Sequence, residues 1–120
     1  MLNLDTNIII AGLNDELTKR EFELLEDESI AISDIVLWEI SKLIQRKRIV
    51  LDIESAAFKR LLARLTVFPI TLAIARQSTM LDFHSDPADE IIAATSVIEN
   101  IPLLTRDKKI RRSKIVPLAT

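Results

Sequence analysis

Apolar residues are distributed along the chain in two alternating patterns. Short continuous apolar runs predict buried strands at residues 2–4, 29–32, 67–70 and 102–104, with an edge strand at 115–117. Apolar spacing of three and four residues predicts helices that begin near residue 8 and cover about 33–46, 52–65, 72–81 and 86–99. An acidic helix over 14–28 and a short helix or turn at 107–112 complete the prediction. Such alternation is typical of βαβ units, so the expected class is α/β: a three-layer α/β/α sandwich around a mostly parallel sheet.

Polar residues stand where several of these helices are expected to begin. Asp5, Asp34, Asp52 and Thr71 can each cap the helix that follows. Asp86-Pro87 marks another start, because proline at the first helical position gives up no needed hydrogen bond. In parallel α/β folds the carboxyl ends of strands and the amino ends of helices share one edge of the sheet, where ligands bind. We therefore expect functional side chains along that edge.

Composition narrows the possible chemistry. With 120 residues and 48% hydrophobic content, the chain is expected to form one domain over residues 1–120. No apolar run is long enough to span a bilayer and no signal-peptide pattern is present, which predicts a cytoplasmic protein with no membrane association. Because the chain has no cysteine, one histidine and one glycine, it excludes thiolate catalysis, a two-histidine zinc site, a P-loop and the dinucleotide fingerprint. A Ser-His-Asp site would have to use His84.

Carboxylates are the plentiful functional groups that remain, and four of them are candidates. Asp5 and Asp107 follow the first and fourth predicted strands, and each can simply cap a helix. Asp89 lies in the first turn of its helix, where the unpaired amides favour an acid in any case. Glu39 is the exception, because it falls on the apolar stripe of its helix or at the stripe's margin, and a buried carboxylate without a partner is costly. Taken singly, each acid is weak evidence for a site.

Taken together, the four acids point to a metal site. The predicted topology brings Asp5, Glu39, Asp89 and Asp107 to one edge of the sheet, where so many carboxylates resist joint ionisation unless a cation is present. Oxygen ligands without histidine or cysteine favour Mg²⁺ or Mn²⁺. A divalent ion there can activate a water for phosphodiester hydrolysis, so the acids would act by ligation and orientation. Four polar neighbours are candidate supporting residues: Thr6, Asn7, Asp86 and Thr105.

The order and spacing of four motifs resemble those of the PIN-domain ribonucleases, and in particular the VapC-like toxins of toxin–antitoxin pairs. The resemblance covers nearly the whole chain. Its motifs are Leu4-Asp5-Thr6-Asn7, Leu37-Trp38-Glu39-Ile40, His84-Ser85-Asp86-Pro87-Ala88-Asp89 followed by Ile91-Ile92-Ala93-Ala94-Thr95, and Leu104-Thr105-Arg106-Asp107.

This resemblance implies an α/β/α sandwich with Mg²⁺- or Mn²⁺-dependent endoribonuclease activity. It implies metal-site acids at Asp5, Glu39, Asp89 and Asp107. It also implies an RNA substrate, homodimers, and inhibition by a cognate antitoxin, a segment of which lies across the active-site groove.

Charge is unevenly distributed, although the net charge is only -2. Residues 106–114 hold six bases against Asp107 alone, and residues 46–48 are all basic. These segments are candidate contacts for RNA phosphates, and a solvated helix end explains either one nearly as well. The RNA-binding candidates are Arg46, Arg106, Lys108, Lys109, Arg111 and Arg112. The acidic segment 14–28 is most simply a solvated face, with a partner groove formed by its apolar residues as the alternative.

Two other functions remain open on the sequence. A receiver domain or an aspartyl phosphatase fits the fold, but the phosphatases place a second Asp two residues after their nucleophile, and Asn7 stands there. A catalytically silent protein of the same fold that binds RNA or a protein partner is the other alternative. The presence of all four expected acids argues against it.

Overall fold

The computed structural model describes residues 1–120 and contains one sheet of four parallel strands. Its order is β3-β2-β1-β4. The strands are β1 (Leu2–Leu4), β2 (Ile30–Ser33), β3 (Leu65–Phe68) and β4 (Leu103–Leu104). The central strand β1 pairs Leu2 with Ile30 of β2 and Asn3 with Leu103 of β4. The predicted α/β class with a parallel sheet is confirmed.

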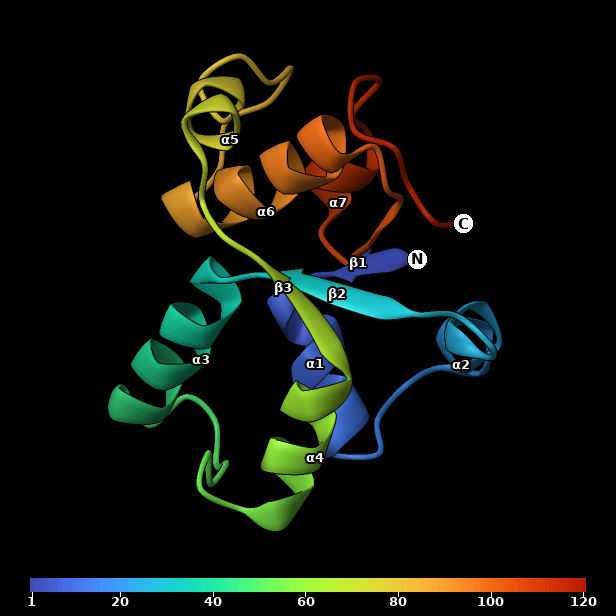
Figure 1. Ribbon diagram of the computed structural model, residues 1–120, viewed down its shortest axis with the longest axis vertical. Coiled ribbons are helices and arrows are strands. Elements are labelled where there is room, and N and C mark those ends of the chain that lie inside the picture. Colours follow the sequence, from blue (N-terminus) through green and yellow to red (C-terminus); the bar gives the residue numbers. More distant parts are fainter.

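Helices cover both faces of this sheet. In Figure 1, α5, α6 and α7 lie above the strands, α1, α3 and α4 lie below them, and α2 lies beyond one end of β2. None of these helices combines the length and the apolar character that a membrane span requires. Their bounds are α1 (Thr6–Leu13), α2 (Lys19–Leu25), α3 (Ile35–Gln45), α4 (Ala56–Arg64), α5 (Leu72–Gln77), α6 (Pro87–Glu99) and α7 (Lys108–Arg111).

Several predicted element boundaries are wrong. The helix α4 begins after Ser55, whose hydroxyl accepts the amide of Phe58 at 3.1 Å, whereas Asp52 forms a local turn by accepting the amide of Glu54 at 2.9 Å. The acidic segment is helical only over 19–25, and α5 ends at Gln77 instead of near residue 81. The expected strand at 115–117 reduces to one isolated bridge between Leu103 and Leu118.

Two expected caps do not form with side chains. Asp34 and Asp86 stand at the N-cap positions of α3 and α6, but neither carboxylate accepts a capping hydrogen bond. Asp34 instead accepts the amide of Ile70 at 3.3 Å, which fastens the turn after β3 to the start of α3. The carboxylate of Asp86 remains exposed at the strand-end edge.

The hydrophobic core lies on both faces of the sheet, between the strands and the helices. Ile8 of α1, Ile32 of β2 and Ile92 of α6 are each at most 1% exposed. The polar residue Asn3 is also fully buried, and its Nδ2 donates to the carbonyl of Ile92 at 3.2 Å and to Ser96 Oγ at 2.9 Å. This pair of bonds fixes α6 against β1, and so fixes the start of α6 relative to the end of β1.

Candidate metal centre and neighbouring groove

Three of the four predicted acids meet at the edge of the sheet. Asp5 follows β1, Glu39 lies in α3, and Asp89 lies in the first turn of α6. One carboxylate oxygen from each lies within 4.8 Å of the others. The elements that carry these acids are far apart in sequence, so packing of α3 and α6 beside β1 creates the cluster.

Asp5 is both a helix cap and a member of the cluster. Its Oδ1 accepts the amide of Thr6 at 2.8 Å, which is the expected capping bond for α1. Its Oδ2 accepts the hydroxyl of Thr105 at 2.6 Å. The residue is 3% exposed, and capping alone does not require such burial beside two other acids.

Glu39 faces the other acids instead of the apolar core. It is half-buried, and the hydroxyl of Thr6 donates to its Oε1. Its neighbours Val36 and Ile40 are buried on the core side of α3. The carboxylate therefore occupies the margin of the apolar stripe, turned toward the end of β1.

Asp89 is held by Ser85, which is not among the predicted site residues. The hydroxyl of Ser85 donates to Asp89 Oδ2 at 2.9 Å, from the segment just before α6. A serine four residues before an acid contacts it when both lie in one helix, but Ser85 precedes α6, so the spacing alone does not predict this bond. Each of the three clustered acids thus accepts a hydrogen bond from one hydroxyl group.

Asp107 lies outside the tight group of three and faces the same hollow. Its Oδ1 accepts the amides of Lys109 at 2.8 Å and Ile110 at 3.2 Å, so it caps α7. A cavity of about 490 Å³ lies between this residue and the start of α6. Its lining is wholly polar and consists of Ser85, Asp86, Asp89, Asp107, Lys108 and Lys109.

The clustered acids resist ionisation when no cation compensates them. Burial raises the pKa of Asp5 and of Glu39 above their ordinary values, even though the hydroxyls of Thr105 and Thr6 act in the opposite direction. Burial is also the main cause that raises the pKa of Asp89 to about 6, and the charges of Asp5, Glu39 and Asp107 add to it. An all-oxygen donor set with this excess of negative charge fits a hard divalent cation such as Mg²⁺ or Mn²⁺.

The predicted supporting residues differ in how they meet the cluster. Thr6 and Thr105 contact acids directly through their hydroxyls. Asp86 lines the cavity and raises the pKa of Glu39 through its charge, as one of the smaller causes. Asn7 is exposed, and no hydrogen bond joins its side chain to an acid. Its position at the start of α1 turns the side chain toward solvent.

The predicted RNA-binding bases also divide. Lys108 and Lys109 line the acid cavity, and Lys109 Nζ donates to the carbonyl of His84 at 3.3 Å. Arg106 instead pairs with Glu21 of α2 at 2.7 Å. The remaining candidates are exposed at the ends of α3 and α7: Arg46, Arg111 and Arg112.

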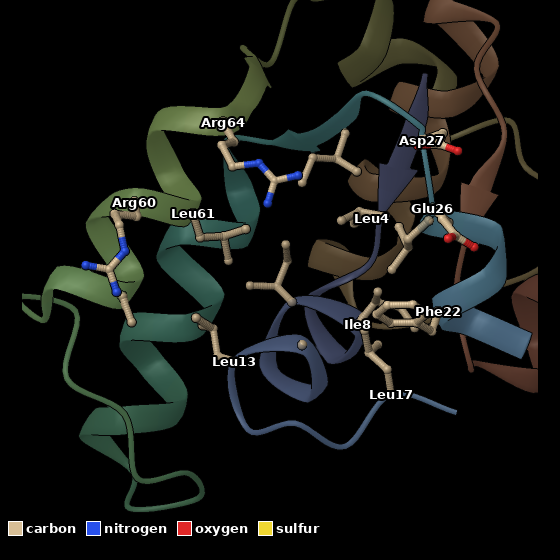
Figure 2. A pocket seen from close by; sticks show the side chains of 15 residues that line it. Leu4, Ile8, Leu13, Leu17, Phe22, Glu26, Asp27, Arg60, Leu61 and Arg64 are labelled. Atoms are coloured by element: carbon tan, nitrogen blue, oxygen red, sulfur yellow. The ribbon is translucent and has the colours of Figure 1, made fainter. Parts of the chain in front are cut away.

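A second hollow, an apolar groove of about 600 Å³, lies among α1, α2 and α4. Figure 2 shows Arg60, Leu61 and Arg64 of α4 on one side and Phe22 of α2, with Glu26 after it, on the other. Phe22 is 61% exposed although it is a large apolar residue. No residue lines both the groove and the acid cavity.

Comparisons with known proteins agree with this architecture. The family model described as PIN domain matches residues 3–115. Among solved structures, VapBC2 from Rickettsia felis bound to a promoter DNA fragment matches with a TM-score of 0.72 at 23% identity, covering 99% of this chain and 98% of that one. A toxin–antitoxin complex from Klebsiella pneumoniae matches with a TM-score of 0.73 at 24% identity, covering 100% and 97%. At such identities these structures establish the fold alone. No curated protein sequence matches significantly.

Proposed function

The chain belongs to the PIN domain family, and from this premise we propose that it is a metal-dependent endoribonuclease and the toxin of a toxin–antitoxin pair. The observation that carries the proposal is the convergence of Asp5, Glu39 and Asp89 from three separate elements to within 4.8 Å. Three half-buried or buried carboxylates at this distance are costly to keep charged, and a divalent cation removes that cost.

In this proposal Asp5, Glu39 and Asp89 hold Mg²⁺ or Mn²⁺, and Asp107 completes the acidic wall of the cavity. A bound divalent cation lowers the pKa of a water and neutralises charge that develops on a phosphodiester. The hydroxyls of Thr6, Thr105 and Ser85 each occupy one carboxylate oxygen and so fix the direction in which the other lone pairs point. The chain's own contribution is therefore a rigid, negatively charged set of oxygens.

The cations beside the acids position the RNA. Lys108 and Lys109 line the same cavity as Asp89 and Asp107, so a phosphate held by an ammonium group there lies next to the carboxylates. The exposed Arg111 and Arg112 extend this basic surface along the end of α7, and Arg46 provides a separate one at the end of α3. Substrate binding is thus expected to weaken with salt, whereas the acids determine turnover.

A cognate antitoxin is the proposed protein partner, as in the toxin–antitoxin complex from Klebsiella pneumoniae that shares the fold. The apolar groove suits the apolar face of an amphipathic helix. Its rims have opposite charge, with Arg60 and Arg64 on one side and Glu26 and Asp27 on the other. The matching helix carries an acidic edge toward α4 and a basic edge toward α2. A segment that also covers the acids must continue beyond the groove.

A second copy of this chain is the other proposed partner. The strand β3 is at one edge of the sheet, and apolar side chains are exposed on it and after it. Leu72, at the start of α5, is 80% exposed. Leu72→Glu is expected to raise the dissociation constant of a homodimer, measured by sedimentation velocity over a range of concentrations. If the wild-type chain and Leu72→Glu show the same sedimentation coefficients at every concentration, this surface is not the dimer interface.

The proposal is tested by RNA cleavage with the purified, antitoxin-free chain. Mg²⁺ or Mn²⁺ should support cleavage and EDTA should abolish it, and Asp5→Asn and Asp89→Asn should be inactive. Asp52→Asn is the matched control, because Asp52 is an exposed acid that only shapes the turn before α4. Cleavage without metal, or equal cleavage by all three variants, would contradict the mechanism. Metal binding without cleavage would favour the catalytically silent alternative.

A further inference from the structure

A two-pronged ion pair joins α2 to the loop that carries Thr105 and Asp107. Arg106 donates from Nε to Glu21 Oε2 at 2.8 Å and from Nη2 to Glu21 Oε1 at 2.7 Å. The same Nη2 donates to the carbonyl of Glu16 at 3.1 Å. This guanidinium is therefore engaged with protein acceptors on two sides, whereas the neighbouring Lys108 has no ion-pair partner.

Glu21 is also oriented by contacts within its own helix. Its Oε1 accepts the amide of Thr18 at 2.9 Å and its own amide donates to Thr18 Oγ1 at 3.1 Å, which together form a capping box for α2. The residue is 9% exposed. The carboxylate is thus oriented by its own helix, and a bidentate guanidinium is the partner that fits it.

The segment on either side of Arg106 reaches the acid cluster. Thr105 Oγ1 donates to Asp5 Oδ2 at 2.6 Å and accepts the amide of Asp107 at 3.0 Å. Asp107 then caps α7. Three consecutive residues thus contact α2, the end of β1 and the start of α7, and Arg106 supplies the connection to α2.

We propose that Arg106 is a positioning residue, held by Glu21, which fixes Thr105 and Asp107 against the acid cluster, and that it is not a phosphate contact. The proposal rests on the proposed metal site. It replaces the role that the basic run at 106–114 suggested for this arginine. A phosphate that bound this guanidinium would have to displace the carboxylate of Glu21. The two negatively charged groups would then lie side by side, which is unfavourable.

The test compares Glu21→Gln, Arg106→Gln, the double variant and Arg106→Lys. Mn²⁺ affinity is measured by calorimetry without RNA, and kcat, KM and their salt dependence are measured with RNA. Each single variant should weaken Mn²⁺ binding by roughly tenfold and lower kcat with little change in KM, as loss of support around a metal ligand does. The double variant should be no worse than either single variant, because each single substitution already removes the same Glu21–Arg106 interaction. Arg106→Lys should recover part of the loss.

Lys108→Gln supplies the contrasting pattern, since an RNA contact should raise KM and reduce its salt dependence while Mn²⁺ affinity stays constant. The proposal is overturned if Arg106→Gln follows that pattern and Glu21→Gln behaves as wild type. It is also overturned if the pair affects thermal stability alone, with Mn²⁺ affinity unchanged in the folded variants. Failure of the wild-type chain to bind Mn²⁺ would overturn the proposed function as well, which separates the two failures.

Discussion

The acid cavity and the apolar groove are built in opposite ways. The acid cavity lies at the strand-end edge, and its lining is wholly polar. The groove lies among α1, α2 and α4, with apolar walls and charged rims. The parallel topology brings polar residues at strand ends and helix starts to one edge of the sheet, and helix packing then sets how closely they approach. The groove depends instead on helices that leave apolar surface uncovered, which is a sign of a partner. We therefore expect changes in one hollow to leave the other intact.

The largest expected effect is the loss of RNA cleavage in Asp5→Asn. Removal of one charge from the cluster should lower kcat by well over a hundredfold, since a ligand matters more than the roughly 10- to 100-fold effect of its supporting residues. Affinity for an antitoxin helix should stay the same, because Asp5 does not line the groove. Cleavage assays and calorimetry measure the two properties. Loss of both activities at once would break the contrast between the hollows.

Metal binding should also stabilise the fold. Saturation at a hundred times the dissociation constant adds about 2.7 kcal/mol to the free energy of unfolding, if the unfolded chain does not bind. Mn²⁺ should thus raise the melting temperature of the wild-type chain and of Asp52→Asn, but not that of Asp89→Asn. Calorimetric melting with Mn²⁺ or EDTA measures the shift. An equal rise in Asp89→Asn would place the ion elsewhere.

Charge reversal on the α4 rim should affect the groove alone. Arg60→Glu combined with Arg64→Glu should weaken binding of an acidic-edged antitoxin helix by about tenfold, mainly through repulsion. Lys59→Glu is the matched control, because Lys59 lies on the same helix and pairs with Glu54 outside the groove. RNA cleavage should be unchanged in both proteins. Equal loss of affinity in the control would point to a general charge effect.

The smallest expected effect is on pH dependence. The pKa of Asp89 is raised to about 6 from 3.8, so the folded chain binds more protons than the unfolded chain between these values. Stability without metal should therefore fall as pH rises from about 4 to 6, and Mn²⁺ affinity should rise over the same range as protons leave. Melting temperatures in EDTA, compared between wild type and Asp89→Asn, measure this. A slope that persists in Asp89→Asn would assign it to other groups.

The pKa of Glu21 is lowered to about 2, chiefly by its hydrogen bonds to Arg106, and this acts in the opposite direction. Its contribution to stability is complete above the unfolded value of 4.5 and is lost as pH falls toward 2. In Glu21→Gln this loss below pH 4.5 should be absent. Asp89 therefore changes the pH dependence of stability mainly between about pH 4 and 6, and Glu21 changes it below pH 4.5.

Much of the fold and part of the candidate site were predictable from local pattern. Strand and helix periods and the cap at Asp5 depend on residues a few positions apart, and these predictions are confirmed. The predicted start of α4 was wrong because Asp52 and Ser55 both offer capping oxygens; the helix begins at Ser55, which caps the amide of the buried Phe58. The role of Ser85 was missed, because Ser85 lies in the irregular segment before α6, where no periodicity relates it to Asp89.

By itself, the sequence determined the parallel α/β order, the absence of cysteine chemistry, and the presence of acids where strands and helices meet. These properties follow from residue type and short-range periodicity. The tertiary structure alone decided that Glu39 turns toward Asp5, that α1, α2 and α4 expose an apolar groove, and that Arg106 meets Glu21 across 85 residues of sequence. Such contacts depend on how closely packed elements approach one another, and no local pattern in the sequence predicts the distance between elements that are far apart along the chain.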